Sequence, residues 1–137
     1  MKIEKLVFNF FQVNTYICYF ENKNCLIIDP GMSNDDECKL FNNFIETNNL
    51  KICKVFLTHL HIDHILGLVF LNSNYTFETY FNFDDKYLNH FSFELSEMYG
   101  LNFLEPNGID IKNIDTLHFE NEIIEIIKTP GHSKGHV

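Results

Sequence analysis

Residues 58–67 read T-H-L-H-I-D-H-I-L-G and place three histidines and one aspartate within six positions. His59, His61, Asp63 and His64 form the spacing H-x-H-x-D-H. Imidazole and carboxylate donors together suit zinc, iron or manganese better than calcium or magnesium. The stretch therefore predicts a metal site. The alternative is that these four polar residues occupy an exposed turn and bind nothing.

The residues around this motif predict that its side chains converge. The apolar run 53–57 is typical of a short buried strand. In an extended segment leaving such a strand, His59 and His61 point the same way, because side chains repeat every second residue. Asp63 is placed to cap a helix running from His64 to about residue 71. A strand, a ligand-rich loop and a helix would thus bring several donors into one small volume.

The rest of the chain predicts an α/β fold. Apolar spacing of three or four residues predicts helices over 33–48 and 84–99, the first capped by Ser33 and the second ended by Gly100. Period-two or continuous apolar patterns predict strands over residues 2–8, 13–20, 25–29, 76–81, 115–119 and 122–128. Strand, helix and strand in this order indicate a sheet with helices packed on it.

Length and composition bound the protein's class. At 137 residues, the chain 1–137 is expected to form a single domain. A net charge of −9 repels phosphate backbones and argues against nucleic acid as a partner. Four cysteines without C-x-x-C spacing predict free thiols in a reducing compartment. No signal peptide and no membrane-spanning stretch is recognisable, so we expect a cytoplasmic protein without a membrane partner.

A second segment carries a candidate ligand at the end of a predicted strand. Residues 129–133 read T-P-G-H-S, and a histidine directly after Pro-Gly at a strand end is placed to face a site. With 58–64 and the I-D-P-G stretch at 28–31, this segment resembles the metallo-β-lactamase superfamily. The Q-V-N-T-Y stretch at 12–16 and M-Y-G-L at 98–101 most resemble small glyoxalase II-like hydrolases.

The resemblance implies a fold and a ligand set. The fold is an αββα sandwich, of which this chain supplies the N-terminal portion with an incomplete second sheet. His59, His61 and His132 would hold one metal ion, while Asp63 and His64 would reach a second. Zinc is the expected metal, as one or two ions, with iron or manganese as alternatives.

Other polar residues receive supporting or no roles. Asp29, at the end of the strand 25–29, either caps its turn or orients the ligand loops, and the resemblance favours the supporting role over ligation. The bridging aspartate and last histidine of the family fall in later segments, and His136 does not take their place. His136 is expected to pack or hydrogen-bond, and His90 and His118 are expected to be structural or solvated.

The predicted function is that of a metal-dependent hydrolase. Three neutral imidazoles with an open position would carry a metal-bound hydroxide that attacks a carbonyl, with Asp63 holding the water or a second ion. A small thioester is the expected substrate, because its thiolate leaves without a proton. One alternative is a metal-binding but catalytically inactive domain that self-associates through its incomplete sheet. Another is a mono-iron sulfur dioxygenase.

Overall fold

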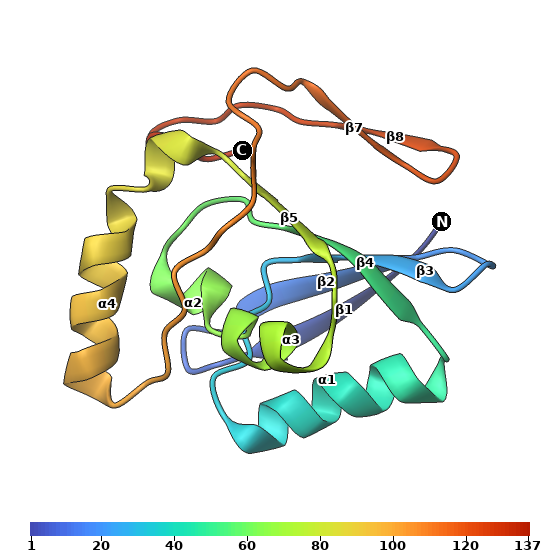
Figure 1. The fold of residues 1–137 in the computed structure, drawn as a ribbon, viewed down its shortest axis with the longest axis horizontal. Helices are drawn as coiled ribbons and strands as arrows, with labels where there is room; N and C mark the ends of the chain where they lie inside the picture. The colour runs from blue at the N-terminus through green and yellow to red at the C-terminus, as the bar shows by residue number, and fades with distance from the viewer.

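Six strands form a mixed sheet in the order β1-β2-β3-β4-β5-β6 (Figure 1). The structure is a computed structural model and describes residues 1–137. The first three strands are antiparallel neighbours, and each later strand runs parallel to the one before it. The strands are β1 (Lys2–Phe8), β2 (Val13–Tyr19), β3 (Asn24–Ile28), β4 (Lys51–Phe56), β5 (Glu78–Phe81) and β6 (Ile109–Asp110).

Helices follow the parallel strands and cover one face and one end of the sheet. They are α1 (Asp35–Thr47), α2 (Ile62–Ile65), α3 (Leu68–Asn74), the 3-10 helix η1 (Phe83–Asp85) and α4 (Leu88–Tyr99). Helix α1 begins one residue later than predicted, because the side chain of Asn34 rather than Ser33 accepts the backbone N–H groups of the first turn. Gly100 ends α4 in the left-handed conformation, as predicted.

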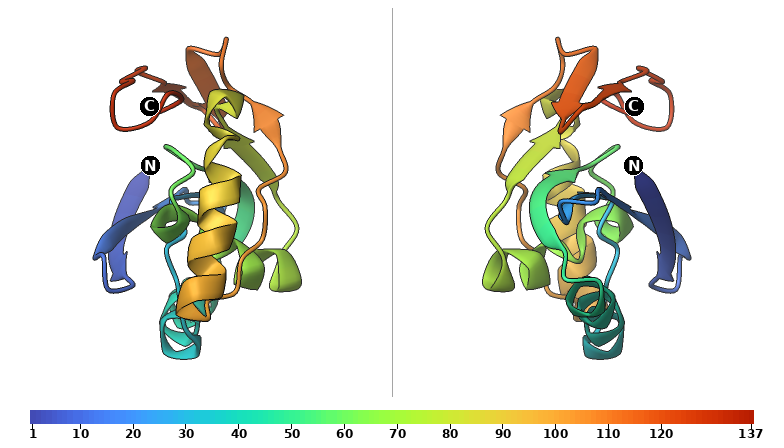
Figure 2. Two further views of the ribbon diagram at one scale, coloured as in Figure 1. Left: turned by 90° about the vertical axis from the view of Figure 1, so that its left-hand side faces the viewer. Right: turned by 90° about the vertical axis from the view of Figure 1, so that its right-hand side faces the viewer.

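The two faces of the sheet bury separate apolar clusters. Ile27 and Val55 face Phe41 of α1 and Leu71 of α3. On the opposite face, Leu26 and Phe56 belong to a cluster that includes the hairpin residues Leu117 and Phe119. The hairpin consists of β7 (Thr116–Phe119) and β8 (Glu122–Glu125). Figure 2 shows that α1 and the hairpin lie on opposite sides of the sheet.

The second sheet contains only this hairpin. Strand β8 ends at Glu125 and is shorter than predicted, although Ile126 still donates its N–H to the carbonyl of Asp115, which faces it across the hairpin. Strand β6 was not predicted, and its two residues are too short to give a periodic signal. All four cysteines are free, as predicted. None of the helices has the length and apolar character needed to span a bilayer.

The helix predicted from His64 to about residue 71 is two helices, α2 and α3, separated at Gly67. The N–H of Gly67 donates to the carbonyl of Pro30 at 2.8 Å. Asp63 is not the N-cap: that position belongs to His61, which makes no side-chain capping bond, and Asp63 lies inside the first turn of α2. The contact with Pro30 interrupts the helix and brings its first part against the turn that contains Asp29.

Replacing Gly67 tests this close approach. A Cβ atom at residue 67 would lie 2.8 Å from the carbonyl oxygen of Pro30 and 2.7 Å from Cε of Met32. We expect Gly67→Ala to lower the free energy of unfolding by about 1–3 kcal/mol, because the backbone of Pro30 must move. Urea denaturation measures this loss. The control is Ser73→Ala on the exposed side of α3, which should change it by less than about 0.5 kcal/mol. Equal midpoints for both variants would contradict the account.

Candidate metal centre

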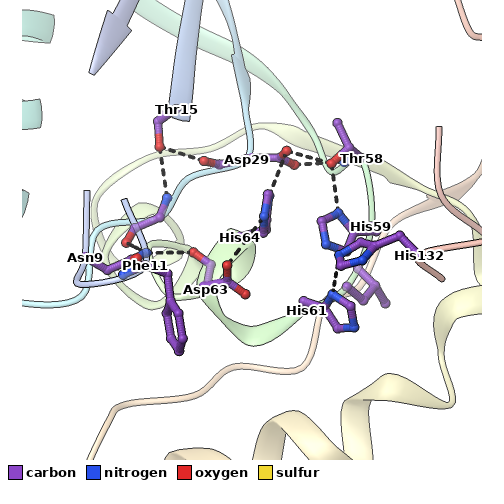
Figure 3. Close-up of polar contacts among 12 residues, drawn as sticks. Asn9, Phe11, Thr15, Asp29, Thr58, His59, His61, Asp63, His64 and His132 are labelled. Atoms are coloured by element: carbon purple, nitrogen blue, oxygen red, sulfur yellow. Dashed lines mark hydrogen bonds and ion pairs between the residues drawn. The ribbon is translucent and has the colours of Figure 1, made fainter. Parts of the chain in front are cut away.

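Three histidines from two distant segments meet beyond the ends of β4 and β8. One ring nitrogen from each of His59, His61 and His132 lies within 4.8 Å of the others. Nδ1 of His61 is 2.9 Å from Nε2 of His132. Figure 3 shows the three rings turned toward one another. The arrangement offers three nitrogen donors to one cation.

The backbone around the loop fixes where these rings lie. Leu57 and Leu60 are fully buried and anchor the segment between β4 and α2 in the core. His59 and His61 flank Leu60 in the sequence, and the centroids of their rings are 4.7 Å apart. The N–H of Val137 donates to the carbonyl of Thr58 at 3.1 Å, so the segment that carries His132 returns to the start of the loop.

A hydrogen-bond chain sets the tautomer of His59. The hydroxyl of Thr58 donates to Oδ2 of Asp29 at 2.6 Å and lies 3.0 Å from Nδ1 of His59. Since its proton goes to the carboxylate, this hydroxyl accepts from Nδ1–H, and the lone pair of His59 is on Nε2. That Nε2 is buried and has no hydrogen-bond partner. An unpaired buried nitrogen is costly unless a cation occupies the position it faces, so the residues fit a bound metal.

Asp29 orients several groups at once and is only 4% exposed. Its Oδ1 accepts the N–H of Thr58 at 2.8 Å, and its Oδ2 lies 2.9 Å from Nδ1 of His64. The carbonyl of Asp29 accepts from Thr15, and the same hydroxyl accepts the N–H of Gly31 (Figure 3). Of the two roles considered for Asp29, the structure shows the one that orients the ligand loop.

Asp63 and His64 lie beside the three histidines and not among them. Oδ2 of Asp63 is 3.5 Å from Nε2 of His64, and the ring of His64 is 4.1 Å from that of His59 between centroids. Asn9 donates to the carbonyl of Asp63 at 3.0 Å and ties it to the turn between β1 and β2. One carboxylate oxygen and one ring nitrogen are thus paired next to the three-histidine cluster.

Burial and neighbouring charges control the protonation of the imidazoles. Burial, together with the nearby imidazoles of His64 and His61, lowers the pKa of His59 to about 2. Burial and then His132 lower the pKa of His61. Burial also lowers the pKa of His64, but the hydrogen bond and charge of Asp29 outweigh it, so the net pKa is raised. His59 and His61 are therefore neutral, as metal ligands must be.

The remaining histidines lie apart or bond locally. Nδ1 of His136 is 2.7 Å from the hydroxyl of Thr129, and its ring is 5.0 Å from that of His59. This hydrogen bond agrees with the packing or bonding role expected for His136. His90 is exposed with Nε2 3.3 Å from Glu94, and His118 is exposed, as predicted.

Sequence reasoning gave no role to Thr58, Asn9 or Asp85, although each holds a ligand-bearing loop. Thr58 lies inside the motif stretch, but nothing in its identity indicates which partners its hydroxyl takes. Asn9 and Asp85 act through contacts with segments distant in sequence, and they carry no signal in the sequence itself.

A family model described as the metallo-beta-lactamase superfamily matches residues 8–137. The chain belongs to this superfamily. Among curated relatives, hydroxyacylglutathione hydrolase from Buchnera aphidicola subsp. Schizaphis graminum is 30% identical over 129 residues, which are 89% of this chain and 40% of the relative. Hydroxyacylglutathione hydrolase GloC from Haemophilus influenzae is 29% identical, over 100% of this chain and 65% of its own length. This superfamily member thus spans less than two thirds of these relatives.

Solved structures agree with the fold. BLEG-1, a B3 metallo-beta-lactamase, superposes with a TM-score of 0.81 at 21% identity, covering 98% of this chain and 65% of its own. TTHA1623, crystallised in a di-iron-bound form, gives 0.74 at 23% identity, covering 97% of this chain and 64% of its own. The predicted architecture, an N-terminal portion of a metallo-β-lactamase-like αββα sandwich, is confirmed.

The depressed pKa of His59 predicts an acid-sensitive metal-free protein. Unfolded His59 takes up a proton below its ordinary pKa of 6.5, whereas the folded residue stays neutral down to about pH 2. The unfolded state therefore binds more protons, and stability falls as pH falls. The raised pKa of His64 acts oppositely, but its contribution is nearly complete by pH 6.

Between pH 6 and 5 we expect chelator-treated protein to lose about 1 kcal/mol of unfolding free energy through His59. Urea denaturation at several pH values measures the slope. His59→Asn should flatten it, and His90→Asn should leave it unchanged. A slope that is the same in all three proteins would show that His59 titrates normally when folded.

Proposed function

We propose that the protein is a metal-dependent hydrolase that acts on a small thioester of the hydroxyacyl-thiol kind. The observation that carries the proposal is the buried, unpartnered Nε2 of His59, a residue that belongs to a cluster in which one ring nitrogen from each of His59, His61 and His132 lies within 4.8 Å of the others. The hydroxyacylglutathione hydrolases among its relatives support the thioester class. Zinc, as one or two ions, is the proposed metal, and iron or manganese suits the same donors.

Three histidines would hold the cation, and the role of Asp63 depends on how many ions bind. His59, His61 and His132 would hold the first ion. Asp63 would reach a second ion together with His64 or, with a single ion bound, handle a proton. A bound zinc ion supplies Lewis acidity and lowers the pKa of water from about 15.7 towards 7. Burial lowers the pKa values of His59 and His61, so these two imidazoles are neutral and their lone pairs are available for the cation.

Asp63 is the residue placed to move a proton. Its side chain is about one-fifth exposed, and Asn9 holds its backbone by donating to the carbonyl. In thioester hydrolysis a water oxygen adds to the carbonyl carbon, and the carbon–sulfur bond breaks with its electron pair on sulfur. Asp63 accepts the proton released by the water. The thiolate leaves without protonation, so no further acid is required.

Two variants and a control test the proposal on zinc-loaded protein with S-lactoylglutathione and other thioesters. We expect His61→Ala to abolish measurable turnover by removing a ligand. Asp63→Asn should lower kcat by about 10²–10⁴-fold through loss of the base. The control, His90→Ala, changes an exposed histidine outside the centre and should leave kcat/KM within about twofold of the native value.

Other results would redirect the assignment. Turnover that resists chelators and persists in His61→Ala would contradict metal-dependent hydrolysis. Metal binding without turnover would favour the inactive metal-binding domain, and oxygen uptake with a persulfide by iron-loaded protein would favour the sulfur dioxygenase. Self-association through the incomplete second sheet, where Ile123 of β8 and Ile127 just beyond it are exposed, stays a prediction.

A further inference from the structure

A buried carboxylate outside the proposed ligand set contacts the segment that carries His132. Asp85 ends η1 and is 1% exposed. Its Oδ2 accepts the hydroxyl proton of Ser133 at 2.7 Å, and its Oδ1 accepts the N–H of Gly135 at 2.6 Å. Figure 1 shows the last part of the chain beside the turn that joins β5 to α4. The residues after His132 are therefore fastened to η1.

The two ends of residues 129–136 are hydrogen-bonded to each other, and Gly135 between them packs closely against η1. Thr129 and His136 pair through Oγ1 and Nδ1 at 2.7 Å and through the N–H of Thr129 and the carbonyl of His136 at 2.9 Å. A Cβ atom at Gly135 would lie 2.9 Å from side-chain carbons of Asn82 and Asp85. Only glycine allows this approach, so the turn containing Ser133 and Gly135 is seated directly on η1.

The charge of Asp85 is not compensated by any basic side chain. None of the ion pairs of the chain includes Asp85. A buried carboxylate is costly without an opposite charge, even when it is hydrogen-bonded. A cation among the three imidazoles would supply the positive charge that Asp85 lacks.

We propose that Asp85 is a positioning residue of the metal centre. Its two hydrogen bonds hold the turn after His132 so that this imidazole faces His59 and His61, and its negative charge stabilises the cation. This inference rests on the proposed metal-dependent function and adds a residue that touches neither the cation nor the substrate.

The test is titration of the full chain with Co²⁺ and with Zn²⁺, comparing Asp85→Ala with the native protein. We expect the Kd for each metal to rise about 10–100-fold, the range typical when a residue that orients a metal ligand is removed. The matched control is Asp84→Ala. Asp84 is the preceding residue of η1, carries the same charge and pairs with Lys112 at 2.7 Å on the surface. The Kd of the Asp84→Ala variant for either metal should stay within about threefold of the native value.

The absorption spectrum of bound Co²⁺ separates positioning from general stability. If Asp85 orients His132, the visible bands of Co²⁺-loaded Asp85→Ala shift or weaken, whereas a merely destabilised protein keeps the native spectrum once saturated. If the alanine variant does not fold, Asp85→Asn replaces it in the titration, because it keeps an oxygen acceptor for Gly135. Asp85→Asn should also bind the metal more weakly than the native protein. Native binding and spectrum in a folded Asp85 variant would overturn this inference alone. Failure of the native protein to bind either metal would overturn the proposed function as well.

Discussion

The carboxylate of Asp29 is the contact on which the centre depends. It accepts hydrogen bonds from the backbone and hydroxyl of Thr58 and faces Nδ1 of His64, so it joins the ends of β3 and β4 to α2. Through the hydroxyl of Thr58 it also determines which nitrogen of His59 carries the proton. One buried acid therefore fixes the position and the tautomer of groups that lie far apart in the sequence.

Two anchors bring the chain's second ligand segment to this centre. The N–H of Val137 bonds to the carbonyl of Thr58, and Asp85 holds Ser133 and Gly135. His132 lies between Thr129 and these anchors, so the backbone that carries its imidazole is held on both sides. The rigid part of the site is thus built by the sheet and η1, while the ligands themselves lie on loops at the ends of strands. Such loops can bear reactive groups because the scaffold holds them still.

Local pattern predicted much of this molecule, and tertiary contact explains the rest. The H-x-H-x-D-H spacing and the strand before it were sufficient to place His59 and His61 side by side. The proximity of His132 followed only from the family resemblance, because no periodicity links residues separated by most of the fold. The break at Gly67 depends on the carbonyl of Pro30, and the role of Asp85 depends on a turn near the end of the chain. No local sequence pattern predicts either contact.

The central claim is that three imidazoles from two segments bind one cation. X-ray absorption at the zinc edge of the zinc-loaded chain measures this directly, because it counts imidazole ligands and their distances. The account predicts three imidazole nitrogens at about 2.0–2.1 Å, and the loss of one in His132→Ala. A native spectrum without imidazole scattering, or one that His132→Ala leaves unchanged, would contradict it.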